Sequence, residues 1–370
     1  MTHLLVGFFI SLIVTLLVIR FDHVHGHFSS DHDLNGVQKF HVHPVPRIGG
    51  ISLFIAMLAI WVVQLVKQAP SSREFSLLLL SSLPAFLGGL IEDVTKKVGV
   101  LHRLVLTMLA AVVGFFLLDA GLHRLDIPYV DSLLVYVPFA LLITAVAAGG
   151  VANAINIIDG YNGLAGVYAV IVFFALGYVA FICGDLLIWG AALAMVGALL
   201  GFLVWNYPRG LIFLGDGGAY FIGFMLAELS ILLVNRHPQV SAWFPFLLLI
   251  YPVIETVFSI YRRKFLKGGS PGMPDAAHLH QLIYKRLVRW ALNSNEAHHK
   301  TQRNAMTSPY LWVLSSLAVI PALLFWQHTW VLQLFTLLFV FSYIWLYRSL
   351  VLFRAPKWMI IRKIHQSDEE

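Results

Sequence analysis

Apolar runs of about 17 to 23 residues recur along almost the whole chain of 370 residues. Each run can cross ~30 Å of hydrocarbon as a helix that rises 1.5 Å per residue. Hydrophobic residues make up 59% of the chain and charged residues 12%, with a mean hydropathy of +0.80, so one soluble core cannot bury the apolar surface. We therefore predict an all-α fold, a polytopic membrane helical bundle. Its roughly eleven predicted transmembrane helices occupy residues 4–20, 48–66, 75–91, 101–118, 133–155, 164–182, 186–204, 217–234, 241–260, 309–326 and 329–347.

The basic residues lie mostly on one side of these spans. If the N-terminus faces outward, 21 of the 25 Lys and Arg residues fall in inner loops or in the C-terminal tail, and 4 fall outside. Because basic residues concentrate in cytoplasmic loops, we predict a periplasmic N-terminus and a cytoplasmic C-terminus. Residues 1–347 then form a single transmembrane domain, and residues 348–370 form a cytoplasmic basic tail. The predicted cytoplasmic loops are residues 21–47, 92–100, 156–163, 205–216 and 261–308.

Two adjacent carboxylates, Glu92 and Asp93, follow the third predicted span and precede the cations Lys96, Lys97 and Arg103. Such a group suits a magnesium ion with a diphosphate, because hard oxygen ligands hold the metal while cations neutralise the phosphate charge. The alternative is a solvated helix end with ordinary flanking charges.

The fifth predicted span runs into a dense set of Asn, Asp and Gly residues, NAINIIDGYNGLAG at 153–166. This composition predicts that the helix breaks into a loop with an exposed backbone. Asn153, Asn156, Asp159 and Asn162 offer amide and carboxylate oxygens to a metal or to a nucleobase edge. A capped turn between two membrane helices is the alternative.

Asp216 lies in the segment FLGDGG, at the start of the eighth predicted span. A carboxylate costs up to ~3 kcal/mol at the bilayer centre and less at its edge, so we expect a partner, for which a divalent cation is suited. A plain helix N-cap is the alternative. Glu228 and Glu255 also lie inside predicted spans and are functional candidates by position. Packing against a polar neighbour explains Glu228 equally well.

The longest inner loop combines basic residues with histidines. Arg263 belongs to the basic run RRKFLK, and His278 and His280 follow a Gly/Pro turn. The basic residues can bind phosphates or lipid headgroups, or only enforce the topology. Because neither Cys nor a further spaced His completes a tetrahedral zinc set, we expect the histidines to hydrogen-bond phosphate. Arg47, in the first inner loop, either contacts a lipid phosphate or anchors its helix.

The order of these motifs is distinctive: PRIGG, an acidic pair with Lys three residues later, NAIN followed by DG and GL, LGDGG, and a basic loop ending in PDAAHLH. Over roughly residues 35–290 this order resembles the polyprenyl-phosphate N-acetylhexosamine-1-phosphate transferase family. The resemblance implies an enzyme that transfers N-acetylhexosamine 1-phosphate from a UDP-sugar to undecaprenyl phosphate and releases UMP. This step would initiate synthesis of O-antigen or a related surface polysaccharide, at the cytoplasmic face of a bacterial inner membrane.

The resemblance also implies roles for individual residues. Asp216 and Asn156 become ligands of Mg²⁺, with Mn²⁺ as the alternative metal, and Asp93 becomes the catalytic carboxylate beside Glu92 and Asp159. The implied substrate-binding residues are Lys96, Arg103, Asn153, Asn162, Arg47, Arg263, His278 and His280. The implied partners are the UDP-N-acetylhexosamine, undecaprenyl phosphate and membrane lipid. No nucleic acid is expected, and a homodimer is left open, as is the identity of the sugar.

Three positions depart from the family pattern. Glu92 replaces the first Asp of the usual pair, so we assign the catalytic role to Asp93. Asn162 replaces an Asp and cannot act as a base, and Gln281 replaces a third His. The chain also lacks the triple-histidine stretch of the peptidoglycan branch, which disfavours a muramyl-pentapeptide substrate. A secondary transporter for an anionic solute is the alternative function, but it predicts repeated halves that the sequence does not show.

Overall fold

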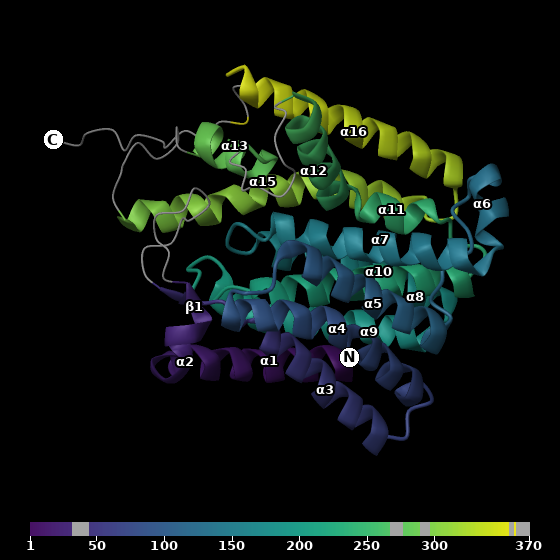
Figure 1. The fold of residues 1–370 in the computed structure, drawn as a ribbon, viewed down its shortest axis with the longest axis horizontal. Helices are drawn as coiled ribbons and strands as arrows, with labels where there is room; N and C mark the ends of the chain where they lie inside the picture. Colours follow the sequence, from purple (N-terminus) through teal and green to yellow (C-terminus); the bar gives the residue numbers. More distant parts are fainter. Residues whose placement is uncertain (32–43, 267–276, 289–296, 355–358, 360–370) are drawn as a thin grey trace.

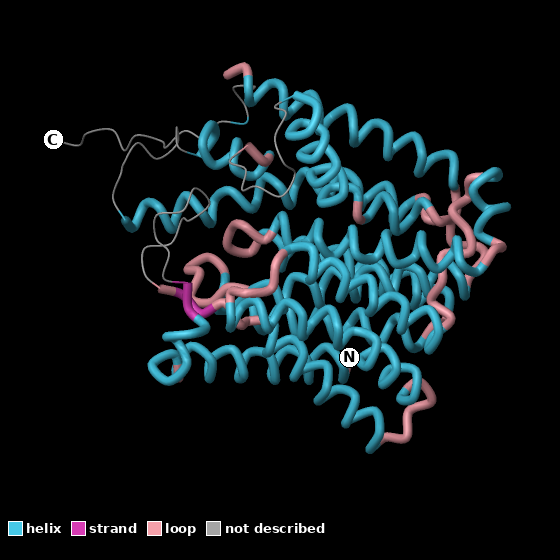
Figure 2. The backbone as a smooth tube through the Cα atoms, in the orientation of Figure 1, coloured by secondary structure: helices cyan, strands magenta, loops and turns pink. Residues whose placement is uncertain are grey.

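The computed structural model describes residues 1–31, 44–266, 277–288, 297–354 and 359, and this part of the chain is a bundle of helices (Figure 1, Figure 2). Nine helices in the described part are long and apolar enough to cross a membrane. The polytopic helical membrane fold predicted from the sequence is therefore confirmed. The nine helices are α1 (Thr2–Arg20), α4 (Ser72–Thr95), α5 (Val100–Leu118), α7 (Val137–Ile158), α8 (Leu164–Cys183), α9 (Leu186–Asn206), α10 (Gly215–Arg236), α15 (Ala297–Leu324) and α16 (Thr329–Val351).

Two predicted spans correspond to shorter helices. α3 (Gly50–Val66) has 17 residues, and the span predicted at 241–260 is divided into α11 (Trp243–Leu248) and α12 (Ile250–Tyr261). Pro252 has no N–H to donate to the carbonyl of Leu248, four residues earlier. The Tyr168 hydroxyl of α8 donates to that carbonyl instead, at 2.8 Å. Every predicted run thus matches a helix or a divided pair, while the number of crossings and the side of the N-terminus stay predictions.

α10 is the central helix, buried at every position from Gly215 to Val234. Glycines allow other helices to approach it closely. A Cβ atom added at Gly50 of α3 would collide with the backbone of Gly218, and one added at Gly89 of α4 would collide with the backbone of Asp216. The start of α10 is therefore fixed between α3 and α4.

Midway along α10, the buried Glu228 packs against Gly114 of α5. Neither carboxylate oxygen has a hydrogen-bond partner among the residues that the structure describes. The polar neighbour that the sequence analysis offered as the alternative is therefore not found among these residues. Glu228 lies three turns along α10 from Asp216, in the contact between α10 and α5.

Short elements lie at the end of the bundle where α4 and α7 end and α10 begins, here called the site end. There α2 (Asp22–Ser29) leads into β1 (Ser30–Asp31), which pairs antiparallel with β2 (Val45–Pro46), and α13 (Leu279–Ile283) lies at the same end (Figure 1). α6 (Pro128–Leu134) lies at the opposite end. The π-helical segments are η1 (Arg262–Leu266) and η2 (Tyr284–Val288). The predicted loops 21–47 and 261–308 thus contain regular structure; their other parts, and most of the tail predicted at 348–370, lie outside the described residues.

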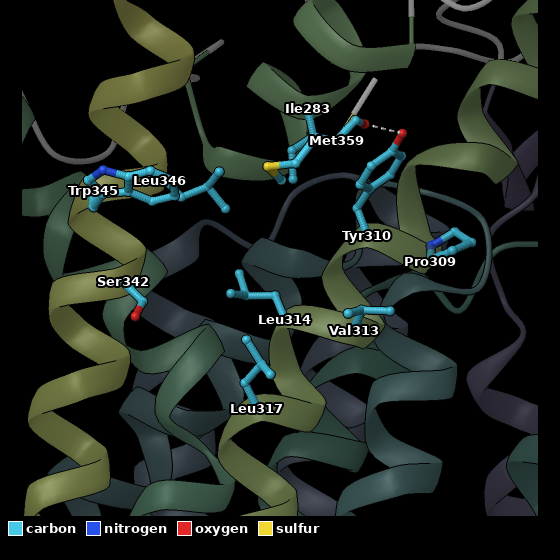
Figure 3. Close-up of a pocket in the computed structure, with 10 residues that line it drawn as sticks. All are labelled: Ile283, Pro309, Tyr310, Val313, Leu314, Leu317, Ser342, Trp345, Leu346 and Met359. Carbon is cyan, nitrogen blue, oxygen red and sulfur yellow. Dashed lines mark hydrogen bonds between the residues drawn. The ribbon is translucent and has the colours of Figure 1, made fainter. Parts of the chain in front are cut away.

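An apolar groove of about 460 Å³ separates α15 from α16 (Figure 3). Its walls include Tyr310 and Leu314 of α15, Trp345 and Leu346 of α16, and Ile283 of α13. α16 also contacts α11, α12 and α13. The last helix is therefore held against the bundle through α11 and α12, and through α13 at the site end.

Candidate active site

The first turn of α10 is held by a carboxylate from another helix. Asp93, near the end of α4, accepts the backbone N–H of Asp216 on Oδ1 and that of Gly217 on Oδ2, both at 2.8 Å. These N–H groups have no partner within α10, so Asp93 acts as their cap. Its side chain has an exposed fraction of 0%. Gly215 turns the chain into the helix with a φ of +70°, where Arg47 and Asp93 leave no space for a Cβ atom.

Asp216 itself is at the centre of a polar cluster. Its Oδ1 accepts a hydrogen bond from Asn156 Nδ2 of α7 at 2.8 Å, and its Oδ2 forms an ion pair with Arg103 of α5. Arg47 Nη2 lies 3.7 Å from Asp93 Oδ1 and 3.9 Å from Asp216 Oδ1. Two carboxyl groups and two guanidinium groups from four separate segments therefore meet at the site end.

Arg47 reaches this cluster because its segment is bound to the chain before α10. The N–H of Phe213 donates to the carbonyl of Pro46, and the N–H groups of Gly49 and Gly50 donate to the carbonyls of Phe213 and Leu214, at 2.9 to 3.0 Å. The segment PRIGG thus runs beside the segment LGDGG. The two motifs are more than 160 residues apart in the sequence but form one structural unit.

A second layer surrounds Arg103. Its guanidinium lies 5.7 Å from the ring centroid of Tyr220, and the Tyr220 hydroxyl donates to Asn153 Oδ1 at 3.3 Å. Asn153 lies almost one turn before Asn156, so both amides face the cluster from α7. Tyr220 was not among the predicted site residues, although its position one turn after Asp216 in a polar helix start could have indicated it.

Glu92 and Lys96 do not join the two carboxylates. Consecutive helix residues point about 100° apart, so the Glu92 side chain diverges from that of Asp93. Glu92 Oε2 accepts the N–H of Val98 at 2.7 Å, and Lys96 Nζ donates to the Ser30 carbonyl at 3.4 Å. In this structure both residues order the turn after α4 and its contact with β1.

The loop between α7 and α8 contains Asp159 and Asn162. Burial raises the pKa of the Asp159 carboxyl to about 7, and the positive charge of Arg47 opposes this shift. Asn162 is buried, and its Nδ2 donates to the Pro208 carbonyl at 3.0 Å. Its N–H donates to Asn304 Oδ1 and its carbonyl accepts from Ser308 Oγ, both at 2.7 Å. Asn162 therefore connects three segments of the chain, and its predicted contact with a nucleotide stays a prediction.

The histidines of α13 lie against this same loop. His278 Nδ1 is 3.0 Å from Glu255 Oε1 of α12. The His280 ring contacts the Tyr161 ring edge-on at 5.5 Å, and its Nε2 lies near Gly160, where an added Cβ atom would be 3.6 Å away. Gln281 Oε1 accepts the N–H of His278 at 3.1 Å, which gives this substitution a capping role.

Arg263 lies on η1, and its Nη2 donates to Ser259 Oγ at 2.9 Å, one turn earlier. That contact does not connect it with Asp216. The structure thus brings Asp93, Asp216, Asn156, Arg47 and Arg103 together, with Asn153 adjacent. Asp159, His278 and His280 belong to the neighbouring loop and α13.

The cluster suits a hard metal ion. Among the described residues, no group of three or more His, Cys, Asp and Glu side chains could hold a metal. Mg²⁺ does not need such a group, because it usually binds through one or two carboxylates together with substrate phosphates and water. Asp216 can supply a carboxylate oxygen, and Asn156 can supply its amide oxygen if the amide rotates, since its nitrogen faces Asp216 in this structure.

Comparison with known proteins supports the relation of this cluster to a family. The family model described as glycosyl transferase family 4 matches residues 75–234, which contain Asp93, Arg103, Asn156 and Asp216. Within residues 75–234 the chain is therefore similar to this family. Matches to the family thus cover α4 through most of α10, the helices that build the cluster.

Curated relatives agree with this assignment. A protein of Bacillus subtilis named probable undecaprenyl-phosphate N-acetylglucosaminyl 1-phosphate transferase is 27% identical over 66% of this chain and 67% of that protein. The decaprenyl-phosphate N-acetylglucosaminephosphotransferase of Mycolicibacterium smegmatis is 29% identical over 74% of this chain and 70% of its own length. The undecaprenyl-phosphate alpha-N-acetylglucosaminyl 1-phosphate transferase of Yersinia pestis is 28% identical over 68% of this chain and 69% of its own. The protein is therefore similar to transferases that act on polyprenyl phosphates in membranes.

Proposed function

We propose that the protein transfers N-acetylhexosamine 1-phosphate from a UDP-sugar to undecaprenyl phosphate, giving undecaprenyl-diphosphate-N-acetylhexosamine and UMP. The observation that carries this proposal is the convergence of Asp216, Asn156, Arg47 and Arg103 at one end of a membrane bundle. A lipid acceptor approaches such a site from the bilayer and a soluble nucleotide from the water. The names of the relatives favour N-acetylglucosamine as the sugar and a polyprenyl phosphate as the acceptor.

The reaction exchanges one phosphoanhydride for another, so it is near-isoenergetic. The protein must mainly position two phosphates and neutralise their charge. Mg²⁺ or Mn²⁺, when bound at Asp216 and Asn156, would polarise the diphosphate and favour departure of UMP. Arg103 and Arg47 now neutralise the carboxylates, and they can transfer their hydrogen bonds to phosphate oxygens when the substrates arrive.

The geometry of Asp93 supports a positioning role. Both of its oxygens accept backbone N–H groups of α10, and its side chain is fully buried. An attack on phosphorus would require the carboxylate to leave these bonds and uncap the helix that holds Asp216. A direct attack by the lipid phosphate, which is largely ionised near neutral pH, needs no such rearrangement.

The proposed setting is the cytoplasmic face of a bacterial inner membrane, where the product would initiate O-antigen or a related surface polysaccharide. The excess of basic residues in the loops at the site end supports this orientation. UDP-sugars are soluble and reach the enzyme from that side.

The test is a donor screen on the purified protein in lipid nanodiscs with undecaprenyl phosphate and Mg²⁺. We expect release of UMP and formation of the lipid-linked sugar with UDP-GlcNAc or another UDP-N-acetylhexosamine, loss of both with a chelator, and recovery with Mg²⁺ or Mn²⁺. Asp216→Asn should lower kcat at least ~100-fold, as expected for removal of a charge that acts on the transferring phosphate.

Asp119→Asn is the matched control, because this carboxylate is at the end of α5 away from the site and its side chain is 94% exposed. Its activity should equal that of the wild type. Absence of UMP with every UDP-sugar tested would overturn the proposal.

A further inference from the structure

Two tyrosines of the last helix contact the segment that carries the histidines. Tyr343 and Tyr347 are one turn apart on α16 and are both buried. The Tyr343 hydroxyl donates to Glu255 Oε2 at 3.0 Å, and the Tyr347 hydroxyl donates to the carbonyl of Ala277 at 3.1 Å. Ala277 directly precedes His278. The two hydroxyls, here called the tyrosine pair, thus bind both sides of the same short segment.

The carboxylate of Glu255 connects three elements. Its Oε1 accepts from His278 Nδ1 at 3.0 Å and from the N–H of Leu279 at 2.9 Å, while its Oε2 accepts from Tyr343. Glu255 is 1% exposed, so it depends on these donors to replace water. Removal of the Tyr343 hydroxyl would leave Oε2 without this donor and weaken the link between α12, α13 and α16.

Ring packing fixes the direction of the tyrosine pair. Phe258 of α12 contacts the Tyr343 ring at 5.7 Å and the Tyr347 ring at 4.7 Å, both in edge-on geometry. The guanidinium of Arg262 lies 5.7 Å from the centroid of the Tyr347 ring. These contacts depend on the rings and not on the hydroxyls, so a Phe substitution should keep the packing and remove only the hydrogen bond.

The segment held by the tyrosine pair extends to the loop beside the candidate active site. The rings of His278 and His280 stack at 5.2 Å, and His280 and Tyr284 each contact Tyr161 at 5.5 Å. Tyr161 lies between Asp159 and Asn162. A continuous set of contacts therefore runs from α16 through Glu255 and the histidines to this loop.

We propose that Tyr343 and Tyr347 are positioning residues that fix the His278–His280 segment against the loop at 159–163 for the transfer reaction. The inference rests on the proposed function, because its effect on turnover requires these histidines to act on the substrates. Tyrosine suits this role because it supplies a neutral donor from a membrane helix. A Lys or Arg at the same place would add a buried charge.

The test compares Tyr343→Phe and Tyr347→Phe with Tyr310→Phe. Tyr310 is a matched control, because its hydroxyl also donates to a backbone carbonyl, that of Met359, but at the groove between α15 and α16 (Figure 3). We expect kcat to fall ~10-fold in Tyr343→Phe and less in Tyr347→Phe, with KM for undecaprenyl phosphate unchanged. Tyr310→Phe should keep the wild-type kcat.

A double-mutant cycle identifies the route of the effect. In a Glu255→Gln background, Tyr343→Phe should cause no further loss of kcat, because the hydroxyl acts through that carboxylate. If the losses of kcat caused by Tyr343→Phe and Glu255→Gln multiply in the double variant, the hydroxyl does not act through Glu255. An unchanged kcat in both Tyr343→Phe and Tyr347→Phe would overturn the positioning role.

Hydrogen–deuterium exchange separates failure of this inference from failure of the proposed function. Peptides covering residues 277–288 should exchange faster in Tyr343→Phe than in the wild type or Tyr310→Phe. Unchanged exchange would overturn the inference whatever the activity. A wild-type protein without transferase activity would overturn the proposed function and the role in turnover, whereas faster exchange in that protein would still support the contact itself.

Discussion

His280 is kept uncharged by its surroundings. His280 is 2% exposed, and burial lowers its pKa to about 3. The neighbouring His278 also lowers this pKa, whereas Glu255 raises it. His280 Nδ1 has no hydrogen-bond partner among the described residues, while Nε2 faces the loop at Gly160. A neutral imidazole in this place can exchange a hydrogen bond with a substrate but does not add a positive charge near neutral pH.

This burial predicts a pH dependence of stability. The unfolded chain binds a proton at His280 as the pH falls below 6.5, but the folded protein does not until about pH 3, so stability is lost over this interval. The loss should approach about 1.4 kcal/mol for each pH unit below 6.5. We expect the melting temperature of the wild type to fall more between pH 7.5 and 5.5 than that of His280→Gln. His102→Gln, at an exposed position, should show the same decrease in melting temperature as the wild type. An equal decrease in melting temperature for His280→Gln and the wild type would contradict the prediction.

At the residue scale, the sequence could indicate which polar residues meet but not how they are used. Asp93, Asn156 and Asp216 lie at the ends of spans that the predicted topology brings to one side, and the structure places Asn156 and Asp93 in contact with Asp216. The spacing could not show that Asp93 caps α10 or that Glu92 binds Val98. Those roles depend on side-chain direction, which the order of residues alone does not determine.

At the element scale, the position of Asp216 depends on how closely α4 approaches α10. Gly88 and Gly89 are consecutive in α4 and both are buried. A Cβ atom at Gly89 would meet the backbone of Asp216 and Gly217, which cannot move without shifting the start of α10. A Cβ atom at Gly88 would lie 2.7 Å from Leu106 Cδ1, the end of a flexible side chain.

Gly89→Ala should therefore displace Asp216, whereas Gly88→Ala should be tolerated. Overpacking against the backbone costs about 1–3 kcal/mol, and a displaced Asp216 should lower kcat by at least ~10-fold. Transferase assays and melting temperatures of the two variants provide the measurement, and each serves as the other's control. Similar activities for both would show that the start of α10 can shift without effect on the site.

The divided ninth span shows what hydropathy could not indicate at this scale. Residues 241–260 are mostly apolar, so their hydropathy predicts one continuous span. The structure ends α11 at Leu248 and begins α12 at Ile250, with Tyr168 supplying the donor that Pro252 lacks. The division depends on a tertiary hydrogen bond from α8, and the direction that it gives to α12 brings Glu255 to His278.

At the scale of the whole molecule, the polar chemistry is gathered at one end. Successive spans alternate in direction, so every second connection lies at the same end, and this allowed the sequence to predict which loops share a side. The segments before α3 and before α10, the turn after α4 and the loop after α7 all lie at the site end (Figure 1). α6 and the connection that contains Asp126 lie at the other end, where Asp126 binds Ser241 and Thr329.

Cysteine labelling tests which end faces the cytoplasm. Lys97, in the turn after α4, is exposed, and Tyr129 on α6 is 88% exposed at the opposite end. In a Cys183→Ser background, which removes the native thiol, Lys97→Cys should react with a membrane-impermeant maleimide only in inverted vesicles. Tyr129→Cys should react only in spheroplasts. This follows from the 21 basic residues assigned to the inner side against 4 on the outer side.

The labelling result also constrains the reaction. With the predicted pattern, the cluster around Asp216 opens to the compartment that contains nucleotide sugars, and the lipid-linked product forms on the inner leaflet. The reverse pattern would place Asp216 outside, where a UDP-sugar does not reach it, and both the topology and the proposed donor would then be wrong. Reaction of both cysteines from one side would contradict the two-ended arrangement itself, because the turn after α4 and α6 are separated by the single span α5 and the connection that follows it.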